Sequence, residues 1–198
     1  FFDLIRYIFI LYTFIFAHEA DHLLITRVST QPDAAESISI HNPTDSIINL
    51  TNYYICDDEK YYKMQTEGDL SPSSSISGFT VQFPDVSISP GDTFHIVLND
   101  NYSEFYGENF VADMVMFGSS DSSLTGSIGF GNNRIRESTE LIILFKWDGE
   151  SNHQIEDIDY FLWGIYQEPI NKTGIPPYLL DESPENQYFD GIAQENYA

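Results

Sequence analysis

The sequence predicts an all-β protein built as a sandwich or a barrel. Short runs rich in β-branched and aromatic residues recur along its 198 residues, each bounded by turn-forming residues. Between Glu36 and His41, Ile38 and Ile40 alternate with serines, which is typical of a strand with one buried face. Residues 141–145 are continuously apolar, which favours a central strand covered on both faces.

Residues 1–20 have the features of a secretory signal segment. Residues 7–17 are apolar apart from Thr13, they follow Arg6, and Ala17 and Ala20 offer small residues for cleavage. The run is too short to span a bilayer, and it lacks the amphipathic period that a surface helix of the domain would show. We therefore expect a secreted protein, extracellular or periplasmic, with a mature form that begins at His18 or Asp21. We expect no transmembrane anchor in this chain.

The stretch from His18 to His22 matches the H-E-x-x-H pattern of zinc proteases. In those enzymes the two histidines lie one helical turn apart and bind the metal, while the glutamate polarises a bound water. Here residues 23–29 favour a strand directly after the motif, and no third-ligand pattern follows. We interpret the match as a coincidence beside a cleavage site and predict no catalytic zinc.

Residues 21–165 are expected to form the sandwich. Extended runs are predicted at 23–29, 36–41, 47–57, 60–64, 79–83, 86–88, 93–98, 111–117, 140–147 and 155–161. Between them, the sequence predicts a Ser-rich loop at 68–78, a helical turn or loop at 101–109, and a Gly/Ser/Asn-rich excursion at 118–133. Asp148-Gly149 supplies the positive φ of a hairpin turn. Several prolines after Tyr166 predict that residues 166–198 are an irregular extension or linker.

The apolar strand positions predict the core, and one interior is expected to hold all of them. They are Ile38, Ile40, Leu50, Tyr53, Ile55, Ile96, Leu98, Leu141, Ile143 and Phe145. Ser39 is expected on the opposite, solvent-facing side, where its replacement by alanine should change stability by less than about 0.5 kcal/mol.

The composition excludes some functions. Hydrophobic residues make up 42% of the chain, enough for a packed core, and the formal net charge is −23. Such a negative field repels phosphate backbones, so direct nucleic-acid binding is not expected. The single cysteine, Cys56, cannot form an intramolecular disulfide and is predicted to be a small buried side chain.

Few residues suggest a chemical site. Acidic clusters occur at residues 57–59, 99–101 and 157–159, which makes Asp57, Asp58 and Asp100 weak calcium candidates, although solvated carboxylates are the default in so acidic a chain. No other cofactor is indicated. The sequence lacks a nucleophile motif, a phosphate-binding loop and a dinucleotide fingerprint, and His41, His95 and His153 are scattered, so we do not expect an enzyme.

The opening strands resemble those of the lamin tail domain. The pattern Glu36-x-Ile38-x-Ile40-x-Asn42-Pro43 is followed by Leu50 and Asp57, then by Pro90-Gly91 and finally by Asp159, over roughly residues 22–165. Two positions depart from the family pattern, Arg27 in place of an acidic residue and Tyr53 in place of tryptophan.

The resemblance implies an immunoglobulin-like β-sandwich that acts as a non-catalytic interaction module. A protein or a surface polymer would be its partner. It leaves one alternative open, an accessory module of a secreted hydrolase, such as a nuclease or phosphatase, with its catalytic domain outside this chain.

Overall fold

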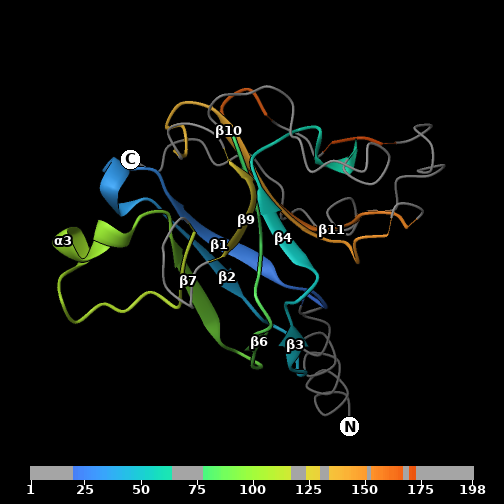
Figure 1. The fold of residues 1–198 in the computed structure, drawn as a ribbon, viewed down its shortest axis with the longest axis horizontal. Helices are drawn as coiled ribbons and strands as arrows, with labels where there is room; N and C mark the ends of the chain where they lie inside the picture. Colours follow the sequence, from blue (N-terminus) through green and yellow to red (C-terminus); the bar gives the residue numbers. More distant parts are fainter. Residues whose placement is uncertain are drawn as a thin grey trace, which may run out of the picture.

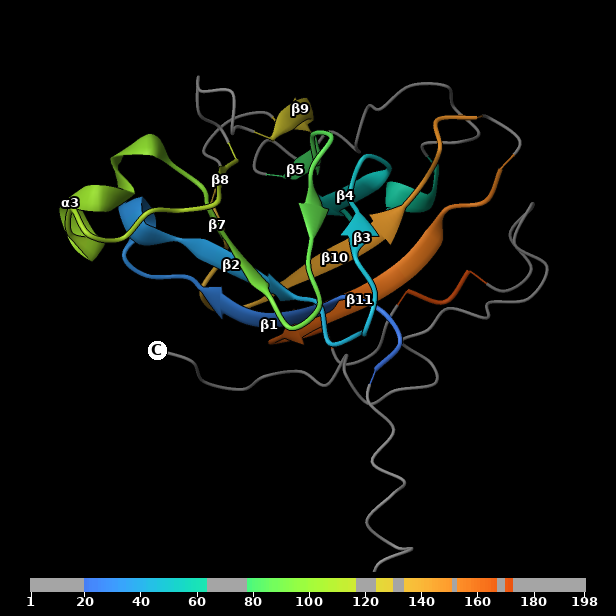
Figure 2. The same cartoon turned by 90° about the horizontal axis from the view of Figure 1, so that it is seen from below.

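The computed structural model describes residues 20–63, 78–116, 124–129, 134–150, 153–166 and 170–172, and these residues form two β-sheets that pack against each other (Figures 1 and 2). The all-β prediction is confirmed. The predicted signal segment lies almost wholly outside the described residues, as do most of the loop at 68–78 and all residues beyond 172.

The smaller of the two main sheets has four strands in the order β1-β2-β7-β8. Its strands are β1 (Leu24–Ser29), β2 (Ser37–His41), β7 (Thr93–Val97) and β8 (Met114–Val115). β2 pairs with β1 and β7 in antiparallel fashion, whereas β8 runs parallel to β7. The parallel pairing requires the chain to cross over between β7 and β8, and this crossover forms the excursion described below.

The larger sheet has five antiparallel strands in the order β11-β10-β4-β5-β9. They are β11 (Glu156–Trp163), β10 (Glu140–Lys146), β4 (Tyr53–Cys56), β5 (Phe79–Gln82) and β9 (Thr125–Gly129). Two short strands, β3 (Ile48–Asn49) and β6 (Ser87–Ile88), form a separate pair. Gly149 has a φ of +88° in the connection between β10 and β11, as the Asp-Gly hairpin signal predicts.

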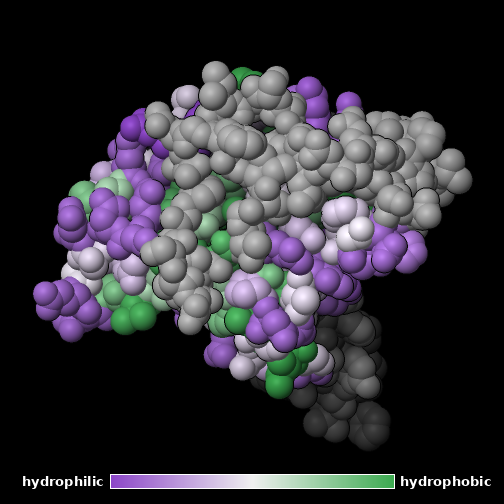
Figure 3. Space-filling view, viewed as in Figure 1, coloured by the Kyte–Doolittle hydropathy of each residue, from purple (hydrophilic) through white to green (hydrophobic). Residues whose placement is uncertain are grey.

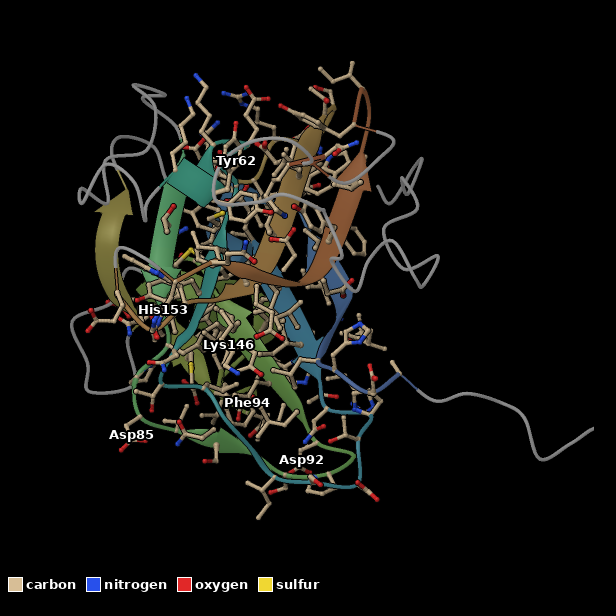
Figure 4. All side chains as sticks on the ribbon, turned by 90° about the vertical axis from the view of Figure 1, so that its right-hand side faces the viewer. Tyr62, Asp85, Asp92, Phe94, Lys146 and His153 are labelled. Atoms are coloured by element: carbon tan, nitrogen blue, oxygen red, sulfur yellow. The ribbon has the colours of Figure 1, made fainter. Side chains whose placement is uncertain are left out.

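Within the described ranges, helical structure is limited to single turns. They are the 3-10 turns η1 (Asp33–Ala35), η2 (Tyr61–Lys63) and η3 (Asp100–Tyr102), and the short helix α3 (Ser103–Tyr106). Figures 1 and 2 both place α3 at one end of the molecule, away from β11. Figure 4 shows Tyr62, in η2, at the end of the molecule opposite Asp92.

The main core lies between the two sheets. It contains seven of the predicted positions, namely Ile38, Ile40, Leu50, Tyr53, Ile55, Ile96 and Leu98. From β10 it takes Ile142 and Leu144, whose side chains point to the same face of the strand. Cys56 is fully buried, as predicted.

A second core covers the outer face of the five-stranded sheet, and it corrects the prediction of a single interior. Leu141, Ile143 and Phe145 belong to this second core, together with Tyr54, Cys56, Tyr61, Trp147, Ile155, Tyr160 and Leu162. Because successive side chains alternate across a strand, the continuous apolar run in β10 supplies both cores at once. The prediction that this strand is covered on both faces is therefore confirmed.

Two predicted extended runs and one predicted loop differ from the structure. Residues 60–64 were expected to be extended, but Tyr61–Lys63 form η2. The side-chain carboxylate of Asp58 accepts the backbone N–H of Lys60 at 2.8 Å, and the backbone carbonyl of Asp58 accepts the N–H of Tyr61 at 3.1 Å, which turns the chain here. In the described part of the run at 111–117, residues 111–116, only the two residues of β8 form a strand. β9 lies within the excursion expected at 118–133, because a register shift in its pairing with β5 accommodates a glycine-rich strand.

Ser39 is also buried, contrary to the solvent-facing position predicted for it. Its hydroxyl lies 3.0 Å from Nδ1 of His95, the residue directly opposite on β7. The alternation of Ile and Ser was correctly assigned to two faces, but both faces are covered. A serine that is satisfied by a cross-strand partner can be buried without a large penalty.

Candidate functional site

The crossover between β7 and β8 presents the most distinctive surface of the molecule. After β7 the chain forms η3 and α3, and Gly107, with a φ of +80°, ends the helix. The hydroxyl of Tyr106 donates to the backbone carbonyl of Ala35 at 2.7 Å and lies 3.2 Å from the hydroxyl of Ser37. These contacts hold the crossover against η1 and the outer face of β2.

Aromatic rings organise this crossover. Phe110 stacks on Tyr106 with ring centroids 4.6 Å apart, and Tyr102 meets Phe110 edge-on at 5.8 Å. Beside these rings, Phe105 is 51% exposed and Val111 is 76% exposed. We call Tyr102, Phe105, Tyr106, Phe110 and Val111 the aromatic surface. Their packing keeps apolar groups in contact with water in a defined arrangement, as in many binding sites.

The charged side chains of the crossover itself have one sign. Asp100, Glu104, Glu108 and Asp113 are all exposed, and the chain has no lysine or arginine between His95 and Met116. Figure 3 shows hydrophilic and hydrophobic residues side by side over the α3 end of the molecule. Aromatic faces and carboxylates both attract organic cations, the first through the ring quadrupole and the second through charge. The arrangement suits guanidinium and ammonium groups.

A buried polar cluster lies on the opposite side of the structure, within the second core. We call Asp157, Tyr61, Tyr160 and Lys172 the Asp157 cluster. The Lys172 ammonium contacts Oδ2 of Asp157 and lies 3.0 Å from the Tyr61 hydroxyl. Tyr61 donates to Oδ1 of Asp157, and the Tyr160 hydroxyl lies 3.3 Å from Oδ2 and 2.5 Å from the Tyr61 hydroxyl.

Sequence reasoning missed this cluster. Asp157 was noted only as one of several acidic residues, and Lys172 lies in the segment predicted to be an irregular extension. A lone lysine among prolines carries no signal of burial, since only the fold brings it across the outer face of β11. The acidity of the chain is the one hint, because a buried carboxylate needs a cationic or hydrogen-bonding partner.

Several residues of the lamin-tail pattern have structural roles. Asp159 joins the sheets, since its Oδ2 accepts the backbone N–H of Ile25 in β1 at 2.5 Å. The Asn42 side chain is fully buried and donates to the carbonyls of Ser46 (2.8 Å) and Ile88 (3.1 Å). Gly91, which follows Pro90, adopts a φ of +76° and donates its N–H to the Asn42 carbonyl at 2.8 Å.

Glu36, the first residue of that pattern, forms a second link between the sheets. Its Oε1 accepts the backbone N–H of Ile135, which precedes β10, at 3.0 Å, while Oε2 has no hydrogen-bond partner among the described residues. Burial raises the pKa of Glu36 from 4.5 to about 8. The Ile135 hydrogen bond and the nearby Arg134 oppose that increase in pKa, while Asp33 and Glu137 add to it.

The weak calcium candidates are not brought together. Asp57 and Asp58 follow β4 in the larger sheet, whereas Asp100 begins η3 after β7 in the smaller sheet. Oδ1 of Asp57 accepts the N–H of Phe79 at 2.5 Å, and burial raises the pKa of Asp57 well above its usual value. Within the described ranges, no group of three or more His, Cys, Asp or Glu side chains is arranged to hold a metal ion.

The histidines have separate partners. His41 lies 3.0 Å from the Thr93 hydroxyl, and His153 pairs with Asp148. That hydrogen bond raises the pKa of His153 and lowers the pKa of Asp148. Of the H-E-x-x-H motif, His22 is buried and its Nδ1 lies 3.1 Å from Oδ1 of Asp21, while His18 and Glu19 are outside the described residues.

Comparisons with known proteins identify no relative: no family model matches the chain, and no curated protein matches it significantly. Among the residues described, no helix is both long and apolar enough to cross a membrane.

Proposed function

We propose that this protein is a non-catalytic binding module whose aromatic surface takes up a Lys/Arg-rich segment of a partner protein. One observation carries the proposal: Phe105 and Val111 are held exposed on an ordered crossover whose own charged side chains are all acidic. Exposed apolar groups of this kind mark interaction sites. The sign of the surrounding charge selects the partner.

The wider context of the proposal comes from the sequence. We place the chain with the lamin tail domains, as an immunoglobulin-like sandwich, on the pattern that runs from Glu36 to Asp159. The two sheets and the structural roles of Asn42, Gly91 and Asp159 support that assignment. The apolar segment at residues 7–17 supports export, so we propose a partner outside the cytoplasm.

Calorimetric titration with short peptides would test the proposed function. A peptide rich in Arg and Lys should bind, and a Glu-rich peptide of equal length should not. The affinity for the basic peptide should fall with added salt, because exposed charges are screened. Phe105→Ser should weaken binding roughly tenfold, as expected for an exposed aromatic anchor.

A matched control variant is available in Ile165→Ser. Ile165 is 77% exposed, comparable to Val111, but it follows β11 in the other sheet. This control should retain full affinity for the basic peptide. Equal weakening by the two substitutions, or equal binding of the basic and acidic peptides, would contradict the proposal.

A further inference from the structure

The Asp157 cluster places an amine and a carboxyl group in contact in a site closed to water. Lys172 and Asp157 have side chains that are 1% and 0% exposed, and the Lys172 Nζ contacts a carboxylate oxygen of Asp157. The two residues come from different segments, β11 and the chain that returns across the second core. We propose that Lys172 and Asp157 are joined by an isopeptide bond, an amide between Nζ and Cγ that forms spontaneously in the folded protein.

Aromatic rings enclose the pair. The Tyr61 ring lies 5.2 Å from that of Phe145 and 6.4 Å from that of Tyr160. Moving a separated ammonium and carboxylate into such a site is costly, so transfer of one proton to give a neutral amine and a carboxylic acid becomes competitive. A neutral lysine amine is a nucleophile, whereas the ammonium is not.

The reaction is a condensation that requires no oxidant or reductant. The nitrogen lone pair attacks Cγ of the protonated Asp157, and the C–N bond forms. One proton then passes from the nitrogen to a carboxyl oxygen, the C–O bond breaks, and water leaves. An amine and an acid thus become an amide and one water molecule.

The two tyrosines are placed to carry that proton. The Tyr61 hydroxyl contacts both reacting groups, since it lies 3.0 Å from Nζ and donates to Oδ1 of Asp157. The Tyr160 hydroxyl, 3.3 Å from Oδ2, can donate to the other oxygen and stabilise negative charge on it during the attack. Nucleophile, electrophile and proton carrier are therefore all supplied by this cluster.

The bond would have a structural consequence independent of partner binding. It would close the chain between residues 157 and 172 into a covalent loop and fix the returning segment onto the outer face of β11. A crosslink of this kind restricts the unfolded chain and also survives reduction, which suits a single-cysteine protein expected to be exported.

Mass spectrometry of the denatured full-length chain tests the proposal directly. After correction for the residue exchange, the wild-type protein should be lighter than Lys172→Arg by one water molecule. Tryptic digestion of the wild type should leave the chain uncut after Lys172 and yield residues 147–198 as one peptide that is lighter than its sequence by one water molecule, because trypsin does not cleave after an acylated lysine. Asp157→Asn should form the same bond with loss of ammonia in place of water.

A second lysine–carboxylate pair, between β10 and β11, provides the control. Lys146 Nζ lies 3.7 Å from a Glu156 carboxylate oxygen, and both side chains are exposed. Lys146→Arg should therefore retain the loss of water. A wild-type protein of full mass, cut by trypsin after Lys172 into linear peptides 147–172 and 173–198, would overturn the proposal and leave a buried ion pair. Because that result comes from the wild type, it holds even if Lys172→Arg fails to fold.

Discussion

The outer faces of the two sheets are covered in opposite ways. On the five-stranded sheet, apolar side chains of β4, β10 and β11 form a second core that encloses the Asp157 cluster. On the four-stranded sheet, β2 and β7 place polar pairs opposite each other, Ser39 with His95 and His41 with Thr93. Among the described residues, the crossover that carries the aromatic surface packs on this face, with Tyr106 against Ser37 and Phe110 against His95 (Figure 2).

This difference suggests that one sheet face contributes mainly to stability and the other mainly to partner binding. A face that buries rings and aliphatic chains contributes directly to the free energy of unfolding. A face built from hydrogen-bonded polar pairs contributes little net stability, but it tolerates a nearby loop with exposed apolar groups. We infer that the outer face of the five-stranded sheet holds the fold together, and that the crossover at the edge of the four-stranded sheet is available for binding.

The largest expected effect is on the second core. Phe145→Ala should lower the free energy of unfolding by about 3–5 kcal/mol, because a fully buried ring is removed from between Tyr54 and Tyr61. Phe105→Ala, on the half-exposed ring of the crossover, should change it by less than about 0.5 kcal/mol. Urea unfolding of both variants measures the contrast, and equal losses would show that the two faces do not differ as described.

The next effect concerns Glu36, at the seam between the sheets. Its raised pKa, about 8 against 4.5, means that the folded state retains a proton that the unfolded state has lost between these pH values. The group therefore destabilises the fold increasingly as pH rises through this window. Below pH 4.5 both states are protonated and the effect vanishes.

Unfolding curves measured at several pH values between 5 and 9 would isolate this contribution. Glu36→Gln should flatten the fall in stability with pH, because an amide has no proton to lose. Glu104→Gln, an exposed substitution on α3 with the same change in charge, should leave the slope as in the wild type. If Glu36→Gln retained the full slope, the titration would have to be assigned to other groups, such as the buried Glu140, whose pKa burial raises to about 7.

The smallest effect tests the polar face. Ser39→Ala should cost about 0.5–1.5 kcal/mol, since it removes a part-buried hydrogen bond to His95 and leaves that ring nitrogen without its partner. This is larger than the sequence pattern suggests for a solvent-facing serine. Ile40→Ala, on the opposite face of β2, should cost about 2–5 kcal/mol. Thermal unfolding of both variants would show which face of β2 contributes more to the free energy of unfolding. A Ser39→Ala loss equal to that of Ile40→Ala would contradict the assignment.

Much of the fold could be predicted because local patterns and global packing agree. The alternation around Ile38 and Ile40, the Asp148-Gly149 turn and the apolar run of β10 each correspond to an observed strand or turn. The division of β10 between two cores could not be predicted, since a continuous apolar run does not show what covers each side. β9 was missed because its glycines carry no strand propensity and its pairing with β5 provides the stabilisation.

The candidate sites were less predictable for a different reason. Carboxylates such as Asp57, Asp58 and Asp100 look alike in a sequence with 31 acidic residues, and only the topology shows that they lie apart. Lys172 becomes significant only when the chain returns across the second core. Residues 101–109 were predicted only as a helical turn or loop, and the aromatic surface was not predicted, because its exposure depends on the anchoring of Tyr106 to Ala35.

Hydrogen-exchange mass spectrometry, with and without the Arg/Lys-rich peptide, tests the separation of stability from recognition most directly. In the free protein, β4 and β10 should exchange slowest, because they lie between two cores. Addition of the peptide should slow exchange in residues 95–113 and leave β10 and β11 unchanged. Peptide-induced protection over β10, β11 and residues 170–172, with none in 95–113, would contradict this account.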